Sequence, residues 1–207
     1  MMDLQQLSDK LNGRRPTLQG ARGQYAVLVP LICQEDGYHL LFEVRASTLH
    51  HQPGEVCFPG GAMESGEAPA DCAMRETEEE LGLDRTCLQL LGPLDFLIRG
   101  SGVIYPLLAI LPPDWSHRLR LNTSEVANTF TVPLSWLRNH PPEVYRYSWR
   151  PHPEDFPYEA VGASPDYPWS PLTSEVPVYR GLPYPLWGMT ARITHHLIDI
   201  IHELKDG

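Results

Sequence analysis

The segment from Gly60 to Leu83 reads GGAMESGEAPADCAMRETEEELGL, and it holds the most informative residues of the chain. Its second half has strong helical character from Pro69 to Leu81, and proline is well tolerated in the first turn of a helix. Gly82 follows at the position where a left-handed residue often ends a helix. The segment therefore predicts a helix over residues 69–81, which the chain enters from a glycine-rich loop.

Two neighbouring sectors of this predicted helix differ in chemistry. Glu76, Glu79 and Glu80 fall on one sector, where their carboxylates repel one another unless a cation lies among them. A solvated acidic helix face has the same pattern, but glycines before the helix let the backbone approach a ligand, and Arg75 can orient one of the acids. Mg²⁺ prefers such oxygen ligands. At about 100° per residue, the sector that faces the core consists of Ala70, Ala73, Met74, Thr77 and Leu81.

The segment resembles the signature of the Nudix family, G-x5-E-x7-R-E-U-x-E-E-x-G-U, in which U is a bulky aliphatic residue. Thr77 departs from the pattern, because an aliphatic residue is usual there, although its methyl group can still face the core. This spacing favours a catalytic helix over an arbitrary acidic one. The matching residues are Gly61, Glu67, Arg75, Glu76, Glu79, Glu80, Gly82 and Leu83.

The resemblance implies an α/β fold, a Nudix-type α/β/α sandwich around a mixed β-sheet. It implies that Glu76, Glu79 and Glu80 bind Mg²⁺ or Mn²⁺, while Arg75 and Glu67 orient the helix and its carboxylates. The implied reaction is hydrolysis of the diphosphate linkage in a nucleoside diphosphate derivative. Such a reaction needs the diphosphate charge neutralised, a water made more acidic and the two held in line, and divalent metal can do all of this.

The general base is left open between a glutamate of the signature and one from a distant loop. Glu76 and Glu79 are the candidates within the signature. Glu125, in the run NTSEV that begins at Asn122, is the outside candidate, because it precedes a predicted strand where relatives place such a residue. The alternative for Glu125 is an ordinary exposed loop acid.

The stretch before the signature resembles a motif of the coenzyme A diphosphatases in this family, L-L-T-x-R-[SA]-x3-R-x3-G-x3-F-P-G-G. Phe42 and Glu43 replace Leu-Thr, and His50 replaces the second arginine. Residues 186–191 (LWGMTA) also resemble the W-G-x-T-A start of the last helix in these enzymes. The resemblance implies cleavage of coenzyme A or an acyl-coenzyme A to 3′,5′-ADP and (acyl-)phosphopantetheine. The residues that match in register are Arg45, Ala46, Gly54, Phe58, Pro59, Gly60 and Gly61.

Arg45, His50, Gly60 and Gly61 are the substrate-binding residues that follow from this resemblance. A guanidinium binds phosphate oxygens in a bidentate way, although Arg45 could also be a surface arginine at a strand end. His50 donates to a phosphate only weakly at neutral pH unless its pKa is raised. Because His50 replaces the second arginine of the motif, ADP-ribose, NADH or another nucleotide stays open as the substrate. A non-catalytic nucleotide-binding regulator is less favoured, because every signature glutamate is present.

We expect a single Nudix hydrolase domain over residues 1–207, with a helix and loop over 1–24. The helix over residues 1–11 ends at Gly13, and a Glu-Asp-Gly turn separates the first two strands. A proline- and aromatic-rich insertion over 140–185 precedes the last helix and predicts only a hairpin. Its aromatic side chains either bind the substrate or pack a lobe or a dimer contact, so a homodimer stays open. The remaining predicted elements are strands 25–33, 38–44, 88–91, 96–98, 103–110 and 129–132, helices 133–138 and 186–204, and hairpin strands 143–149 and 176–179.

The composition limits the partners of the chain. A hydrophobic fraction of 42% is enough for a proper core, and a formal net charge of −10 opposes binding to nucleic acid or an anionic membrane. No apolar run reaches the roughly 20 residues of a membrane span, and the polar start lacks the apolar stretch of a signal peptide. We therefore expect a cytoplasmic enzyme that acts on a small-molecule nucleotide.

Overall fold

The computed structural model describes residues 3–14, 18–151 and 153–204, so Met1 and Met2 of the predicted first helix lie outside the described residues. The helices are α1 (Leu4–Asn12), α2 (Pro69–Leu81), α3 (Trp115–Arg118), α4 (Leu134–Asn139) and α5 (Gly188–Glu203), with 3-10 turns η1 (Arg85–Cys87) and η2 (Glu159–Val161). The strands are β1 (Gly23–Gln34), β2 (Gly37–Arg45), β3 (Val56–Cys57), β4 (Gly60–Ala62), β5 (Gln89–Pro93), β6 (Leu97–Arg99), β7 (Gly102–Ile110), β8 (Val126–Pro133), β9 (Glu143–Trp149), β10 (Leu172–Tyr179) and β11 (Leu186–Trp187).

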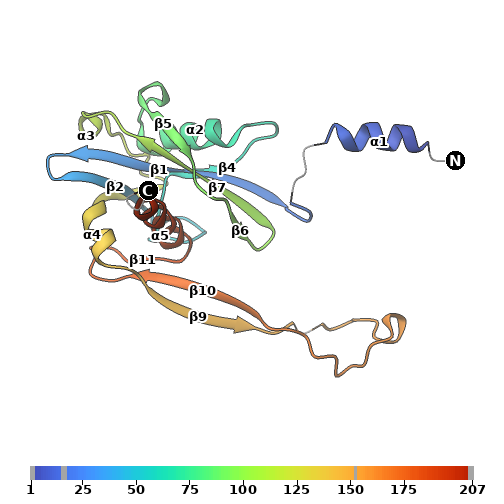
Figure 1. Cartoon of the computed structure of the whole chain (residues 1–207). Coiled ribbons are helices and arrows are strands. Elements are labelled where there is room, and N and C mark those ends of the chain that lie inside the picture. Colours follow the sequence, from blue (N-terminus) through green and yellow to red (C-terminus); the bar gives the residue numbers. More distant parts are fainter. Residues whose placement is uncertain (1–2, 15–17, 152, 205–207) are drawn as a thin grey trace.

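The main sheet is mixed, as predicted. Among the described residues it has eight strands along the path β3-β2-β1-β7-β5, with β4 paired to β1, β6 to β7 and β8 to β2 (Figure 1). β1 and β7 run parallel, whereas the other pairs in this sheet are antiparallel. β4 carries Gly60 and Gly61, so the pairing of β4 with β1 holds the glycine loop against the centre of the sheet.

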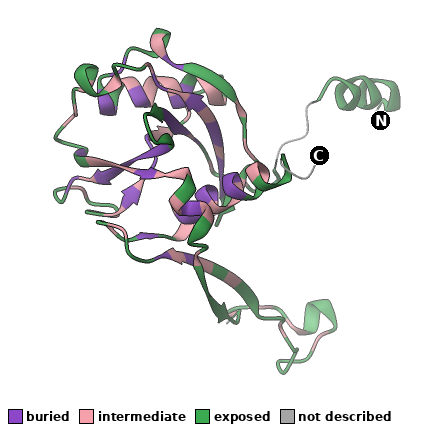
Figure 2. Ribbon diagram, turned by 60° about the vertical axis from the view of Figure 1, so that its left-hand side comes forward, coloured by how far each residue is buried: buried purple, intermediate pink, exposed green. Residues whose placement is uncertain are grey.

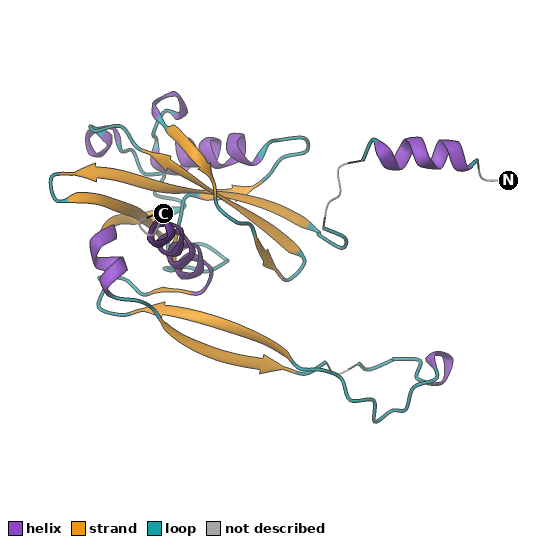
Figure 3. Cartoon of the chain, viewed as in Figure 1, coloured by secondary structure: helices purple, strands orange, loops and turns teal. Residues whose placement is uncertain are grey.

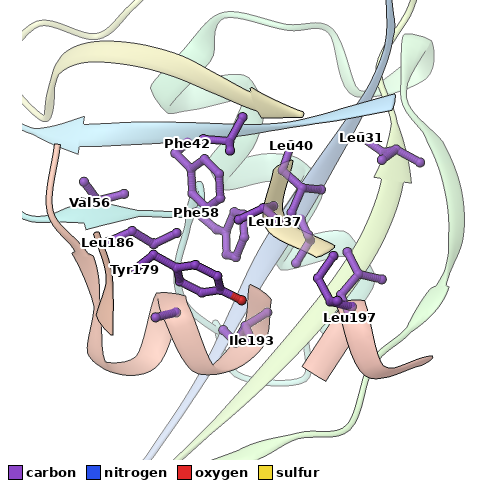
Figure 4. Packing of buried hydrophobic residues seen from close by; sticks show 14 residues of the cluster. Leu31, Leu40, Phe42, Val56, Phe58, Leu137, Tyr179, Leu186, Ile193 and Leu197 are labelled. Carbon is purple, nitrogen blue, oxygen red and sulfur yellow. The ribbon is translucent and has the colours of Figure 1, made fainter. Parts of the chain in front are cut away.

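Helices cover both faces of this sheet, α2 on one side and α4 with α5 on the other (Figure 3). Side chains along β1 and β2 alternate between the two faces, because the period of a strand is two. Leu41 packs in the core under α2, whereas Leu40 and Phe42 pack in the core on the α5 side. Figure 4 shows the latter core, where the Phe42 and Phe58 rings stack 4.9 Å apart above α5. The predicted α/β/α sandwich is confirmed.

Helix α2 has the predicted bounds and the predicted end. Gly82 adopts the left-handed conformation (φ 67°), and its N–H donates to the Glu78 carbonyl at 2.9 Å. An alanine there would cost about 1 kcal/mol in conformation alone. Thr77 is fully buried, and its hydroxyl donates to the Ala73 carbonyl at 2.7 Å, so the departure from the family pattern leaves no polar group unpaired.

The predicted core stripe of α2 needs one correction. Ala73, Thr77 and Leu81 are buried as expected, whereas Ala70 and Met74 are only partly buried. Cys72 and Glu80 are buried as well, although the helical periodicity placed Glu80 with the other acids. The reason is that the glycine loop of β4 covers the side of the helix on which Glu80 lies.

The insertion forms the predicted hairpin, which is longer than the sequence indicated. β9 has its expected bounds, and β10 begins at Leu172 instead of residue 176. β10 pairs with β9 on one side and with the short β11 on the other, which makes a separate three-stranded sheet. In the described part of the chain, no helix is long and apolar enough to cross a membrane.

Candidate active site

Arg75 connects three glutamates of the signature. Its guanidinium donates to Glu67 Oε1 at 2.9 Å, to Glu76 Oε1 at 2.8 Å and to Glu79 Oε2 at 3.3 Å. Hydrogen bonds between charged partners are roughly twice as strong as neutral ones. The bonds from Arg75 and from the Glu64 backbone lower the pKa of Glu67 to about 2. Arg75 thus joins the carboxylates of Glu67, Glu76 and Glu79, and its role in orienting them for a metal stays a prediction.

Glu80 lies beneath this face, between α2 and the glycine loop. It is only 5% exposed, and its Oε2 accepts a hydrogen bond from the Gly60 backbone N–H at 2.8 Å. Burial raises the pKa of Glu80 to about 8, and the nearby carboxylates of Glu76 and Glu125 act in the same direction. A cation beside these oxygens would relieve the repulsion.

The two glycines of the loop are required by close contacts. A Cβ on Gly61 would lie 2.4 Å from Cδ of Glu76, so any side chain there would displace that carboxylate. Gly60 has φ 151°, and a Cβ there would lie 2.3 Å from the Ala26 carbonyl oxygen. The adjacent glycines therefore let the backbone lie against both the Glu76 carboxylate and strand β1.

Glu43 is an acid of the site that the sequence analysis did not select. It lies in β2, two residues after Leu41, so it points to the α2 side of the sheet. It is 1% exposed, and its Oε1 is buried without a hydrogen-bond partner among the described residues. Burial raises the pKa of Glu43 strongly, and the Glu80 carboxylate adds to the effect. The strand alternation could have identified it, but Glu43 was considered only as a replacement for threonine.

Glu125 lies in the loop before β8, and the fold brings it close to Glu43, Glu76 and Glu80. Its negative charge contributes to the raised pKa values of Glu43, Glu76 and Glu80. The Ala46 N–H donates to the Glu125 carbonyl at 2.7 Å, which holds this loop at the end of β2. Glu125 is exposed and therefore accessible to a substrate. Its role as general base stays a prediction.

The atoms near Glu80 that could bind a metal ion are carboxylate oxygens, the ligands that Mg²⁺ and Mn²⁺ prefer. No three Asp, Glu, His or Cys side chains among the described residues converge tightly enough to hold one ion as they stand. Arg75 bridges Glu76 and Glu79, while Glu80 is directed at Gly60. The unpartnered Oε1 of Glu43 and the mutual repulsion of the acids nevertheless fit a hard divalent cation. The half-exposed Glu79 side chain is free to turn toward such an ion.

Two clefts that share lining residues lie near the glycine loop. The inner cleft, about 250 Å³, is lined by Gly60 and Gly61, and the outer cleft, about 600 Å³, extends to the β9–β10 hairpin. Arg45 and Thr190 line both clefts, so the two stretches that resemble coenzyme A diphosphatases meet at one place. The Thr190 hydroxyl donates to the Val56 carbonyl at 2.9 Å and holds the start of α5 against β3.

His50 does not join the other predicted substrate-binding residues. It is exposed in the loop after β2, and it is not among the residues that line the two clefts. The structure therefore brings together Arg45, Gly60, Gly61 and the acids, and it leaves the predicted phosphate contact of His50 without support.

Comparisons with known proteins agree with this arrangement. A family model described as the NUDIX domain matches residues 23–152. The mouse protein named peroxisomal coenzyme A diphosphatase NUDT7 is 32% identical over 124 residues, which cover 59% of this chain and 51% of that protein. The Nudix hydrolase NudL of Enterobacter sp. (strain 638) is 36% identical over 131 residues, which cover 60% of this chain and 67% of the relative.

A solved structure of a MutT/nudix family protein from Enterococcus faecalis has the same fold. It superposes with a TM-score of 0.52 at 13% identity, and the match covers 98% of this chain and 70% of that one. The chain spans about half the length of the mouse relative. The family model matches more than half of the chain, over the strands and the helix that build the acidic site. The chain therefore belongs to the Nudix family.

Proposed function

We propose that this chain, a hydrolase of the Nudix family, cleaves the diphosphate linkage of coenzyme A or an acyl-coenzyme A. The products are 3′,5′-ADP and 4′-phosphopantetheine or its acyl derivative. The observation that carries the proposal is the meeting of Arg45, Thr190 and the Gly60–Gly61 loop around the inner cleft. The same two glycines contact the signature acids, Gly60 through its N–H to Glu80 and Gly61 through its close approach to Glu76. The printed name of the mouse relative, a coenzyme A diphosphatase, supports the choice of substrate.

Glu76, Glu79 and Glu80 are the residues that would hold Mg²⁺ or Mn²⁺. Glu43 would add negative charge from strand β2, which lies beneath α2. Bound metal neutralises the diphosphate and makes the attacking water more acidic. Arg75 keeps the carboxylates of Glu67 and Glu76 in a fixed orientation during the reaction, because it binds both.

The substrate is held from the other side of the loop. Arg45 binds the diphosphate oxygens, and the backbone of Gly60 and Gly61 lets that group approach Glu76 closely. Glu125 accepts the proton of the attacking water in this proposal, since it is the accessible carboxylate that faces the buried acids from a separate loop. Glu76 or Glu79 would take this role if Glu125 proves dispensable.

One observation favours a second candidate within the same reaction class. His50 stands where coenzyme A diphosphatases have an arginine, and it lies outside the two clefts. A site with one fewer permanent positive charge suits a substrate with one fewer phosphate, such as ADP-ribose or NADH. The single domain over 1–207, the cytoplasmic location and a homodimer remain predictions.

A substrate panel distinguishes these candidates. The full chain is incubated with equal concentrations of coenzyme A, ADP-ribose and NADH, with Mg²⁺ and with Mn²⁺, and the products are identified by mass spectrometry. The proposal predicts 3′,5′-ADP and 4′-phosphopantetheine, with the highest kcat/KM for coenzyme A. Turnover of only ADP-ribose or NADH would replace the substrate, and no turnover of the three would reject the proposed function.

A further inference from the structure

The outer cleft has an aromatic wall that none of the signature residues supplies. Tyr147 and Trp149 of β9 line it, and each remains about half exposed (49% and 47%). Their ring centroids lie 5.2 Å apart, and Trp187 of β11 lines the same cleft. Figure 2 shows the hairpin as a largely exposed ribbon beside the buried body of the protein. Exposed aromatic rings grouped along one cleft indicate a binding surface.

The strand register turns these rings to one side of the hairpin. Tyr147 lies opposite Ser174 and Trp149 lies opposite Leu172, so both rings are on the same face of the ladder. Arg146 and Ser148 alternate with them and point to the opposite face, where Arg146 pairs with Glu175 at 2.8 Å. The hairpin therefore presents Tyr147 and Trp149 on one face and the Arg146–Glu175 ion pair on the other.

The same cleft gathers positive charge in a chain whose net charge is −10. Arg45, Arg99 and Arg192 line it. Within the described residues, none of these arginines has a carboxylate partner in a salt bridge; Arg45 and Arg192 donate to backbone carbonyls. Two acids also line the cleft: Glu55 accepts a hydrogen bond from Gln52, and Glu175, whose backbone carbonyl accepts from Arg192, has its carboxylate paired with Arg146. Arginines without carboxylate partners suit phosphate groups.

The size and position of the cleft limit the ligand. About 600 Å³ is within the range of sites for small molecules. The outer cleft shares lining residues with the inner cleft, which contains Gly60 and Gly61 and where the diphosphate would lie. Arg45 and Arg99 line both clefts, whereas Arg192 and the aromatic rings line only the outer one of the two. A ligand that extends outward from the diphosphate thus meets rings and further arginines.

We propose that the outer cleft is a nucleotide-binding subsite specific for a nucleoside with a phosphate on its ribose. The aromatic base stacks on Tyr147 and Trp149, and Arg99 with Arg192 binds the ribose phosphate. The insertion would then select the nucleotide half of the substrate. This inference rests on the proposed function, because the subsite holds one half of the molecule whose diphosphate is cleaved.

Binding can be measured without turnover. Adenosine 3′,5′-bisphosphate is titrated by calorimetry into the full-length wild type, Tyr147→Ala, Trp149→Ala and the control Ser148→Ala, which changes the opposite face of the same strand. Loss of base stacking should weaken binding by about 5- to 100-fold in the aromatic variants. Ser148→Ala should bind as the wild type does. Equal affinity in all four proteins, or no binding to the wild type, would overturn the subsite.

The ribose phosphate is tested by a second comparison. The wild type should bind adenosine 3′,5′-bisphosphate at least about 10-fold more tightly than adenosine 5′-monophosphate, and Arg99→Ala and Arg192→Ala should reduce this preference. Arg146→Ala, on the other face, should preserve it. Equal losses for both nucleotides would overturn the assignment of Arg99 and Arg192 to the ribose phosphate.

The alternative role of the hairpin face that carries Tyr147 and Trp149 is contact with a second copy of the chain. Sedimentation velocity on the wild type and Trp149→Ala would then show a dimer that dissociates in the variant, with nucleotide affinity unchanged, and this would overturn the inference. Failure of the proposed function is recognised separately. A wild type that binds the bisphosphate through Trp149 but hydrolyses no diphosphate keeps the subsite and rejects the reaction.

Discussion

The Glu80 carboxylate accepts a hydrogen bond from the Gly60 backbone N–H at 2.8 Å, and this contact joins the acidic helix to the substrate loop. Glu80 belongs to the segment proposed to hold metal, and Gly60 lines the inner cleft. This buried contact therefore couples the two halves of the site. A change on either side should affect both metal binding and substrate binding.

Replacement of Glu79 by glutamine should abolish most of the turnover while the protein stays folded. Glu79 is half exposed and contributes a carboxylate oxygen, not core packing. Loss of a metal ligand should cost several kcal/mol in the transition state, a decrease in kcat on the order of 100-fold or more.

Glu78→Gln is the matched control for this change. Glu78 is the adjacent acid of α2, and it forms an ion pair with Arg85 away from the cluster. The kcat of this variant should stay within about twofold of the wild-type value, because a surface ion pair contributes little. Equal kcat values for Glu79→Gln and the wild type would remove Glu79 from the proposed ligands.

Replacement of Gly61 by alanine should reduce activity through Glu76. The added Cβ would lie 2.4 Å from Cδ of Glu76, so this carboxylate must shift, which disturbs the hydrogen bond that it accepts from Arg75. Displacement of a positioned group by about 1 Å can lower the rate on the order of 100-fold. Steady-state kinetics should show this loss in Gly61→Ala, whereas Ala62→Ser, at the next and exposed position, should be nearly unchanged. A fully active Gly61→Ala would show that the position of Glu76 is not critical.

Replacement of Glu43 by glutamine should stabilise the metal-free protein. The buried carboxylate of Glu43 has an unpartnered oxygen and lies close to Glu80, so the amide removes a charge that burial disfavours. A gain of about 1–3 kcal/mol corresponds to a Tm increase of about 2–10 °C in a chain of this size. Thermal unfolding in EDTA measures this change.

The same Glu43 variant should gain less stability from added Mg²⁺ than the wild type does, because the negative charge beneath the ion is lost. Glu35→Gln, in the exposed turn between β1 and β2, controls for the removal of one acid from an acidic chain. If the wild type and Glu43→Gln showed the same Tm in EDTA and the same increase with Mg²⁺, Glu43 would have no part in the site.

Replacement of Glu125 by glutamine should lower kcat with little change in KM. The carboxylate is accessible and lies close enough to Glu43, Glu76 and Glu80 to raise their pKa values, which is the position a general base needs. General-base catalysis contributes about 100- to 10,000-fold, so the loss should fall in this range. Thr123→Ala in the same loop should retain kcat. Wild-type rates in Glu125→Gln would return the role to Glu76 or Glu79.

The sequence predicted the parts of the site that depend on local spacing. The bounds of α2, the left-handed Gly82 and the burial of Thr77 follow from periodicity and from residues within a few positions of one another. Short apolar runs along the chain also predicted most strands of the main sheet. These elements needed no knowledge of distant contacts.

Features that depend on distant contacts were missed. Glu80 is buried because the β4 loop lies across it, and Glu43 belongs to the site because β2 runs beneath α2. The outer cleft needs residues as far apart as Arg45, Tyr147 and Thr190. The spacing of residues along the chain does not specify which distant residues line one cleft. This depends on the strand order and on the register of β9 with β10. The phosphate contact of His50 stays a prediction, because motif spacing alone does not determine where its loop points.

The dependence of turnover on divalent metal tests the central claim most directly. The wild type is freed of metal with EDTA, transferred to metal-free buffer and assayed on coenzyme A while Mg²⁺ is added back, with Glu80→Gln measured in parallel. The account predicts no turnover without metal, saturable recovery in the wild type, and in Glu80→Gln an apparent Mg²⁺ affinity weaker by about 10- to 100-fold or no recovery. Full activity in EDTA, or identical Mg²⁺ curves for the two proteins, would contradict it.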